Sequence, residues 1–150
     1  MKNVRRSVRF ASLVALGLVA VVTMVRTSKA SIGNVSKGDL GGNWQMTVIG
    51  QTGCGFGTTL YTFTLNSAGV ASNIFATSHT AGCGDLTTSN ATFQINTLNS
   101  NGSGTASLGC GVGCGWGLNI QVAPDRGSFN LIDVAAANPG NFIEGTAIHQ

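Results

Sequence analysis

Charged residues are scarce in this sequence. Asp, Glu, Lys and Arg together make up only 9% of its 150 residues, and most of the basic ones fall within the first thirty positions. Residues 31–150 hold two basic residues, Lys37 and Arg126, against five acidic ones, which gives them a formal net charge of −3. Binding to phosphate backbones requires a cluster of basic side chains. The composition therefore argues against nucleic acid as a partner.

The sequence also lacks the motifs of common catalytic and cofactor sites. It holds no serine–histidine–aspartate signature, no phosphate-binding glycine loop and no nucleotide-binding fingerprint. A catalytic site needs a nucleophile or base and stabilising groups that converge on one point, and the residue pattern points to no such set. We therefore expect a protein that is not an enzyme and that needs neither a cofactor nor a metal.

One long apolar run is present, and it lies near the N-terminus. Residues 10–25 are almost entirely apolar, follow a basic start, and precede Ser28-Lys29-Ala30, a small-x-small cleavage site. The run is shorter than the roughly 20 residues that a membrane span needs. We predict that residues 1–30 are a signal peptide, and that the protein is secreted or periplasmic with no membrane span after cleavage. An uncleaved anchor is the alternative, because basic residues also follow the run.

All four cysteines, Cys54, Cys83, Cys110 and Cys114, have a glycine on each side. Glycine adopts positive φ and allows another chain segment to come close, so these triplets predict tight loops. Four cysteines in an exported domain indicate two disulfides. The natural pairing joins Cys54 to Cys83 and Cys110 to Cys114, although three pairings exist and the sequence does not choose among them. A four-thiolate zinc site is the alternative, but Cys54 and Cys83 stand alone rather than at zinc-ligand spacing.

After the N-terminal region, short alternating segments separated by turn residues predict an all-β fold, and helical periodicity is absent. In the clearest segment, Tyr61, Phe63 and Leu65 share one face of a strand. The eight predicted strands are residues 43–49, 58–66, 70–79, 91–98, 104–108, 116–122, 128–134 and 141–149.

The predicted organisation is a flexible lead-in over residues 31–41, which are polar and glycine-rich, and a single β-barrel domain over residues 42–150. Eight antiparallel strands can close into an up-and-down barrel, which removes exposed sheet edges. A β-sandwich is the alternative. Because alternate loops of a meander lie at opposite ends, the strand count places all four cysteines in loops at one end of the barrel.

The head of the first predicted strand reads Gly42-Asn43-Trp44. This Gly-x-Trp at the start of an eight-stranded secreted meander resembles the calycin barrels, which include the lipocalins and avidins. The resemblance implies a small, mostly apolar ligand in the barrel mouth and a tryptophan near the closed end. Lipocalins commonly carry an arginine on the last strand that covers this tryptophan, whereas this chain offers only His149 and Gln150 there.

Candidate ligand-binding residues follow from this barrel hypothesis. The residues expected to line the mouth and bind a small apolar ligand are Trp116, Tyr61, Phe63 and Asp133, and Asp133 does so if Phe129 and Leu131 of its own strand face inward. The alternative for the aromatic residues is ordinary core packing. The alternative for the whole protein is a structural or adhesive subunit of a cell-envelope or extracellular assembly. That alternative predicts a filled interior and self-association, whereas the ligand binder predicts a hollow one.

Two further groupings of polar residues deserve a hypothesis of their own. His79 and Asp85 flank Cys83 and would suit metal binding or acid–base chemistry if they met partners. Asp133 and Glu144 flank the loop that contains Pro139, and paired carboxylates are typical of glycoside hydrolysis. Exposed carboxylates and a solvated histidine are the simpler interpretation of both groupings.

Overall fold

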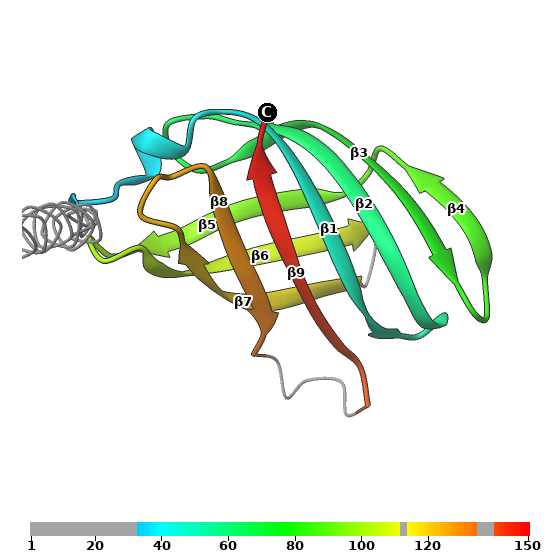
Figure 1. Cartoon of the computed structure of the whole chain (residues 1–150). Coiled ribbons are helices and arrows are strands. Elements are labelled where there is room, and N and C mark those ends of the chain that lie inside the picture. The colour runs from blue at the N-terminus through cyan, green and yellow to red at the C-terminus, as the bar shows by residue number, and fades with distance from the viewer. Residues whose placement is uncertain (1–32, 112–113, 135–139) are drawn as a thin grey trace, which may run out of the picture. The chain divides into compact units, whose positions relative to one another are not determined.

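The computed structural model describes residues 33–111, 114–134 and 140–150 (Figure 1). The predicted signal peptide, residues 1–30, and the first two positions of the predicted lead-in lie outside these ranges. Within the ranges, no helix has the length and apolar character needed to cross a membrane.

The described chain is all-β and antiparallel, which confirms the predicted fold class. A single short 3₁₀ helix, η1 (Lys37–Leu40), precedes the sheet within the described ranges. The nine strands are β1 (Gly42–Thr52), β2 (Gly55–Leu65), β3 (Ala71–Thr80), β4 (Gly84–Thr88), β5 (Thr92–Leu98), β6 (Ser103–Gly111), β7 (Cys114–Val122), β8 (Ser128–Asp133) and β9 (Phe142–His149).

The strand count is nine rather than the predicted eight, and the additional strand is β4. Its sequence, Gly-Asp-Leu-Thr-Thr, contains one apolar residue, so no alternation marks it as a strand. It forms because β3 continues past the core and provides a partner, with His79 opposite Asp85 and Thr77 opposite Thr87. Pairing to a neighbour, rather than its own pattern, determines this element.

All nine strands belong to one sheet in the order β4-β3-β2-β1-β9-β8-β7-β6-β5. The sheet curves strongly, so that β5, β6 and β7 lie across the interior from β1, β2 and β9 (Figure 1). Its two edge strands are β4 and β5, and a single bridge between Val70 and Gln94 joins the start of β3 to β5. The fold is therefore a curved, barrel-like single sheet rather than the two separate sheets of a sandwich.

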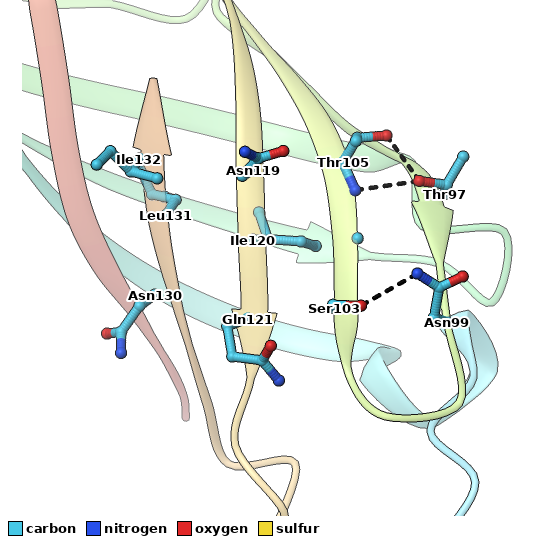
Figure 2. Close-up of a pocket in the computed structure, with 11 residues that line it drawn as sticks. Thr97, Asn99, Ser103, Thr105, Asn119, Ile120, Gln121, Asn130, Leu131 and Ile132 are labelled. Atoms are coloured by element: carbon cyan, nitrogen blue, oxygen red, sulfur yellow. Dashed lines mark hydrogen bonds between the residues drawn. The ribbon is translucent and has the colours of Figure 1, made fainter. Parts of the chain in front are cut away.

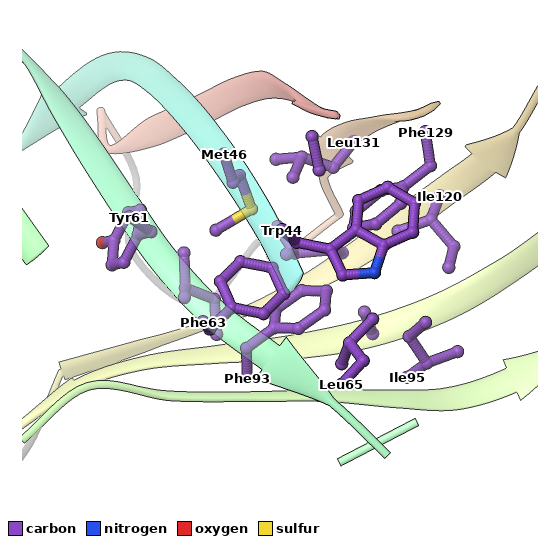
Figure 3. Packing of buried hydrophobic residues seen from close by; sticks show 14 of the residues in the cluster. Trp44, Met46, Tyr61, Phe63, Leu65, Phe93, Ile95, Ile120, Phe129 and Leu131 are labelled. Carbon is purple, nitrogen blue, oxygen red and sulfur yellow. The ribbon is translucent and has the colours of Figure 1, made fainter. Parts of the chain in front are cut away.

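Alternating side chains from both walls fill the interior. Figure 3 shows the aromatic centre of this core, in which the Phe63 and Phe93 rings lie 5.3 Å apart and the Phe93 and Phe129 rings stack at 5.9 Å. Tilted and offset ring pairs at such separations add stability beyond the area that they bury. Phe63 is 3% exposed and lies deep in this packing. The interior between the two walls is thus occupied by side chains.

One end of the sheet is covered by residues 33–41, a segment for which the sequence predicted a flexible lead-in. Val35 and Leu40 are buried, and the Val35 N–H donates to the Ser100 carbonyl at 3.0 Å in the β5–β6 turn. The Arg126 guanidinium lies 3.8 Å from the Asp39 carboxylate and links the segment to the β7–β8 turn. The two apolar side chains explain the difference, because burying them fixes the chain across what we call the closed end.

Trp44 is the main side chain under this cover. Its indole Nε1–H donates to the Leu40 carbonyl at 2.8 Å, and its ring lies 5.0 Å from both Phe129 and His149. The His149 imidazole packs edge-on against the indole, and a methyl group at Gly42 would overlap that imidazole. Glycine at the first position of the Gly-x-Trp motif therefore makes room for the ring that covers the tryptophan.

Candidate functional site

The four cysteines lie at the end of the sheet opposite the closed end, which we call the cysteine end. Cys54 in the β1–β2 turn bonds to Cys83 in the β3–β4 turn, and Cys110 bonds to Cys114 across the β6–β7 hairpin. No cysteine of the described chain is free. Among the three pairings that the sequence left open, the structure has the one described as natural, and the predicted gathering of all four cysteines at one end is confirmed. Structural disulfides form and persist in oxidising compartments.

Glycine enables the close approach of the two joined turns. The Gly82 N–H donates to the Cys54 carbonyl at 2.7 Å, and a Cβ at Gly82 would lie 2.8 Å from that oxygen. Gly55 and Gly84 follow the two bonded cysteines with φ values of 86° and 68°, in the region that favours glycine. The Gly-Cys-Gly triplets therefore serve the geometry of the cross-linked turns.

The structure brings two of the four predicted ligand-binding residues together. Tyr61 and Trp116 line the same interior cavity at the cysteine end, between β1, β2, β7 and β9. Its volume is about 30 Å³, enough for a water molecule, whereas ligand pockets measure roughly 300–1,000 Å³. Burial raises the pKa of the Tyr61 phenol, and a hydrogen bond with Thr59 opposes this in part. Two residues predicted for the barrel mouth therefore line this cavity, but its volume is much smaller than that of a ligand pocket.

The other two predicted residues lie elsewhere. Phe63 belongs to the aromatic centre of the core, away from the cavity. Asp133 ends β8 and lines a separate depression of about 350 Å³ with Phe142 and Glu144. Glu144 pairs with Ile132 and so faces outward, whereas Asp133 has the inward parity of Leu131. The two carboxylates therefore belong to opposite faces of the sheet by strand parity.

His79 and Asp85 meet as the sequence suggested. They are directly opposite one another on β3 and β4, and His79 Nδ1 lies 2.6 Å from Asp85 Oδ1. Both side chains are exposed, at 75% and 85%. Within the described ranges, no three His, Cys, Asp or Glu side chains gather closely enough to hold a metal ion. The two side chains therefore form an exposed hydrogen bond between β3 and β4.

The outer face of the sheet carries large apolar side chains that the sequence analysis did not assign. Ile49 of β1 lies at the centre of this group, with Phe56 and Leu60 of β2 on two diagonals and Phe142 of β9 on a third. Diagonal neighbours in a sheet remain within reach of aromatic side chains. All four are at least 37% exposed. We call these residues, Ile49, Phe56, Leu60 and Phe142, the outer apolar patch.

Few charges interrupt this face. Glu144 is the one charged residue with outward parity on β9, β1 and β2 of the described chain, and threonine and glutamine occupy most other outward positions. Residues of a strand alternate between the two faces of the sheet. The residues at the inward positions reveal the core, and those at the outward positions between them reveal the patch. Sequence reasoning passed over it because the inward residues alone were treated as candidates.

A second part of the outer face, over β5 to β8, forms a shallow depression of about 530 Å³ (Figure 2). Its side chains are mostly neutral and polar, and several bond to one another. Thr97 and Thr105 share a hydrogen bond of 2.7 Å, and the Asn99 amide donates to the Ser103 hydroxyl at 3.0 Å. The two residues of each pair bond to each other across β5, β6 and the turn that joins them, on one side of the depression.

Comparison with protein-family models and with curated protein sequences gives no match to this chain. The resemblance to calycin barrels, based on Gly42-Asn43-Trp44 and the strand number, therefore stays an expectation. The fold and the geometry of the described residues are what bear on function.

Proposed function

We propose that this protein is an exported, non-catalytic structural subunit that packs against further copies of itself in an extracellular or envelope assembly. The single observation that carries the proposal is the distribution of apolar side chains. They fill the interior, leaving a cavity of about 30 Å³ between Tyr61 and Trp116, and large ones also stand exposed on the outer face.

The outer surface suits close packing between copies. Contiguous exposed apolar residues on a soluble protein are typical of interaction sites, and the outer apolar patch has this character. A nearly uncharged face also reduces the cost of removing ionic groups from water when two copies meet. Export agrees with the paired cysteines, because disulfides persist in oxidising compartments.

A second candidate function is the binding of a small apolar ligand at the cysteine end. The observation that favours it is that Tyr61 and Trp116 line one cavity there, as the barrel hypothesis expected. Binding would require this cavity to widen about tenfold to reach the volume of ordinary ligand pockets. The structural function requires no such change.

Native mass spectrometry combined with sedimentation velocity, on protein recovered from the medium or periplasm of an exporting host, tests both candidates. For a structural subunit we expect oligomers whose proportion rises with concentration and whose mass includes no organic adduct. A protein that stays monomeric at all concentrations and carries a small organic adduct would contradict the structural proposal and favour ligand binding. The same spectra report whether residues 1–30 have been removed.

A further inference from the structure

The sheet has two edges, and the chain covers one of them. At the β5 edge, the Ile95 N–H donates to the Gly69 carbonyl at 2.8 Å, next to the bridge that joins β3 to β5. The Lys37 ammonium donates to the Asn96 carbonyl at 2.8 Å, where β5 has an irregularity in its pairing with β6. Backbone groups and a lysine thus occupy positions at which another strand would have to bond.

The β4 edge has no comparable cover. No described residue outside β3 forms a hydrogen bond to the backbone of β4. Alternate peptide groups of an edge strand point away from its partner and are open to a further strand. Natural edges are commonly protected by short strands, charged side chains, proline or a bulge. β4 has five residues and carries one charge, that of Asp85, but it contains no lysine or proline, and its pairing with β3 has no register shift.

Leu86 at the middle of β4 provides a second, independent observation. It lies opposite Ser78, on the face of the sheet that carries Ala76 and Thr80 into the core. Even so, Leu86 is 49% exposed. Figure 1 shows β4 at the margin of the sheet, away from β5, β6 and β7. An apolar side chain on the core-facing side thus lacks the cover that its neighbours have.

We propose that β4 pairs antiparallel with β4 of a second copy of this chain, forming a two-fold dimer with a continuous sheet. The inference rests on the proposed function and names the first contact of the assembly. The register that places Leu86 opposite Leu86 of the second copy brings two half-exposed leucines together. It also sets Asp85 opposite Thr87, whose hydroxyl can donate to the carboxylate.

A second copy fits this edge better than an unrelated strand because β4 is complementary to itself. In the two-fold register, Gly84 lies opposite Thr88 and no acidic residue faces another. Like charges directly opposite would destabilise the pair. Two-fold pairing also uses up the free edge of both copies, so that the dimer closes.

Sedimentation velocity and hydrogen exchange on the wild type and two variants test this pairing. In Leu86→Lys, two introduced ammonium groups would face each other at the centre of the interface, and we expect dimerisation to weaken at least tenfold. Ile148→Lys is the matched control, because Ile148 is 55% exposed on the outer face of central strand β9. It adds the same charge and removes a similar exposed apolar surface, yet it should leave the dimer intact. In the wild type, the β4 amides should exchange more slowly as concentration rises.

Each outcome decides something different. Dimer loss in Leu86→Lys alone, with concentration-dependent protection of β4, supports the edge pairing. If oligomers persist in Leu86→Lys and the β4 amides stay unprotected, the edge pairing is wrong while the structural function stands. Equal losses in both lysine variants also overturn the edge pairing, since a face rather than an edge would then carry the contact. A wild type that is monomeric at every concentration overturns the proposed function as well.

Discussion

At the closed end of the sheet, the chain is held by packing: residues 33–41 lie over Trp44, and the indole contacts Phe129 and His149. At the cysteine end, glycine-rich turns are held by two disulfides over a small cavity. Val35 and Leu40, which close one end, are buried, whereas the described turn residues at the other end are mainly glycine and cysteine. The comparison indicates that disulfides hold the chain together at the end where few buried side chains do so.

The difference also bears on function. A turn made of glycine and cystine presents backbone and few anchoring side chains. The free edge strand β4 begins directly after the cross-linked turn that contains Cys83. The disulfide thereby holds in place the strand that we propose as the dimer contact. The closed end, by contrast, has its neighbouring sheet edge covered.

The largest effect is expected from removing the tryptophan of the closed end. Trp44→Ala should lower the free energy of unfolding by about 3–5 kcal/mol, because a fully buried aromatic side chain is replaced by a cavity. Urea unfolding with the disulfides intact measures this loss. Trp116→Ala, at a partly buried tryptophan of the cysteine end, is the control and should cost roughly half as much. Equal costs would show that packing matters as much at both ends.

The next effect concerns the disulfides. Cys54 and Cys83 are 29 residues apart, and Cys110 and Cys114 are four apart. In the chain-entropy account, the longer cross-link stabilises by about 3.5 kcal/mol and the shorter one by about 2 kcal/mol. Replacing both cysteines of each pair with serine should therefore lower the urea midpoint more for the first pair.

Reversal of that order would indicate that the β6–β7 hairpin, rather than the link between the two other turns, limits the stability of the cysteine end. Adding Trp44→Ala to each of the two cysteine-to-serine double mutants then tests whether the two ends contribute independently to the free energy of unfolding. Because the substituted residues lie at opposite ends of the sheet, the losses should be nearly additive. A large deviation from additivity would mean that the ends are coupled through the core.

Much of this fold follows from local patterns in the sequence. The alternation of Tyr61, Phe63 and Leu65 predicted their inward orientation, and counting strands placed the cysteines at one end. The missed strand β4 did not disturb that count. β4 and β5 run in the same direction, with only residues 89–91 between them. The additional strand therefore does not change the end of the sheet at which each later loop lies.

What the sequence did not reveal depends on contacts between distant residues. Residues 33–41 look polar and irregular, and only the pocket beneath them gives Val35 and Leu40 a place to be buried. His149 reaches Trp44 because β9 pairs with β1, a pairing between residues about a hundred positions apart. The sequence analysis named His149 as the residue present where lipocalins have arginine. The contact between the His149 and Trp44 rings depends on the pairing of β9 with β1.

A smaller effect is expected from His149 itself. His149→Ala removes the edge-on ring from Trp44 and should lower the free energy of unfolding by about 0.5–1.5 kcal/mol, the usual value of an aromatic pair. His149→Phe retains a ring and should recover most of the loss. Phe142→Ala, at the cysteine end of the same strand, is the exposed control and should change stability by less than about 0.5 kcal/mol. Urea midpoints measured at low protein concentration, where copies do not associate, compare the three.

The smallest effect lies in the pH dependence of the closed end. The Asp39 carboxylate accepts hydrogen bonds of 2.8 Å from both the hydroxyl and the backbone N–H of Ser36. The hydroxyl bond, then the backbone bond, and to a lesser degree the Arg126 charge lower the pKa of Asp39 below its ordinary 3.8. A lowered carboxylate pKa stabilises the folded state above pH 3.8, and this contribution is lost as the pH falls through the folded-state value.

The difference in stability between the wild type and Asp39→Asn should therefore be largest at neutral pH and should shrink below about pH 4. Ser36→Ala separates the causes: because the hydroxyl bond comes first among them, this change should reduce the pH-dependent difference, while the bond from the Ser36 backbone N–H remains. Added salt screens ion pairs near the surface, but it should change little here, since the Arg126 charge contributes least to the lowered pKa of Asp39. If salt abolished the difference and Ser36→Ala did not reduce it, the link to the β7–β8 turn would be electrostatic. The closed end would then depend on Arg126 as well as on packing.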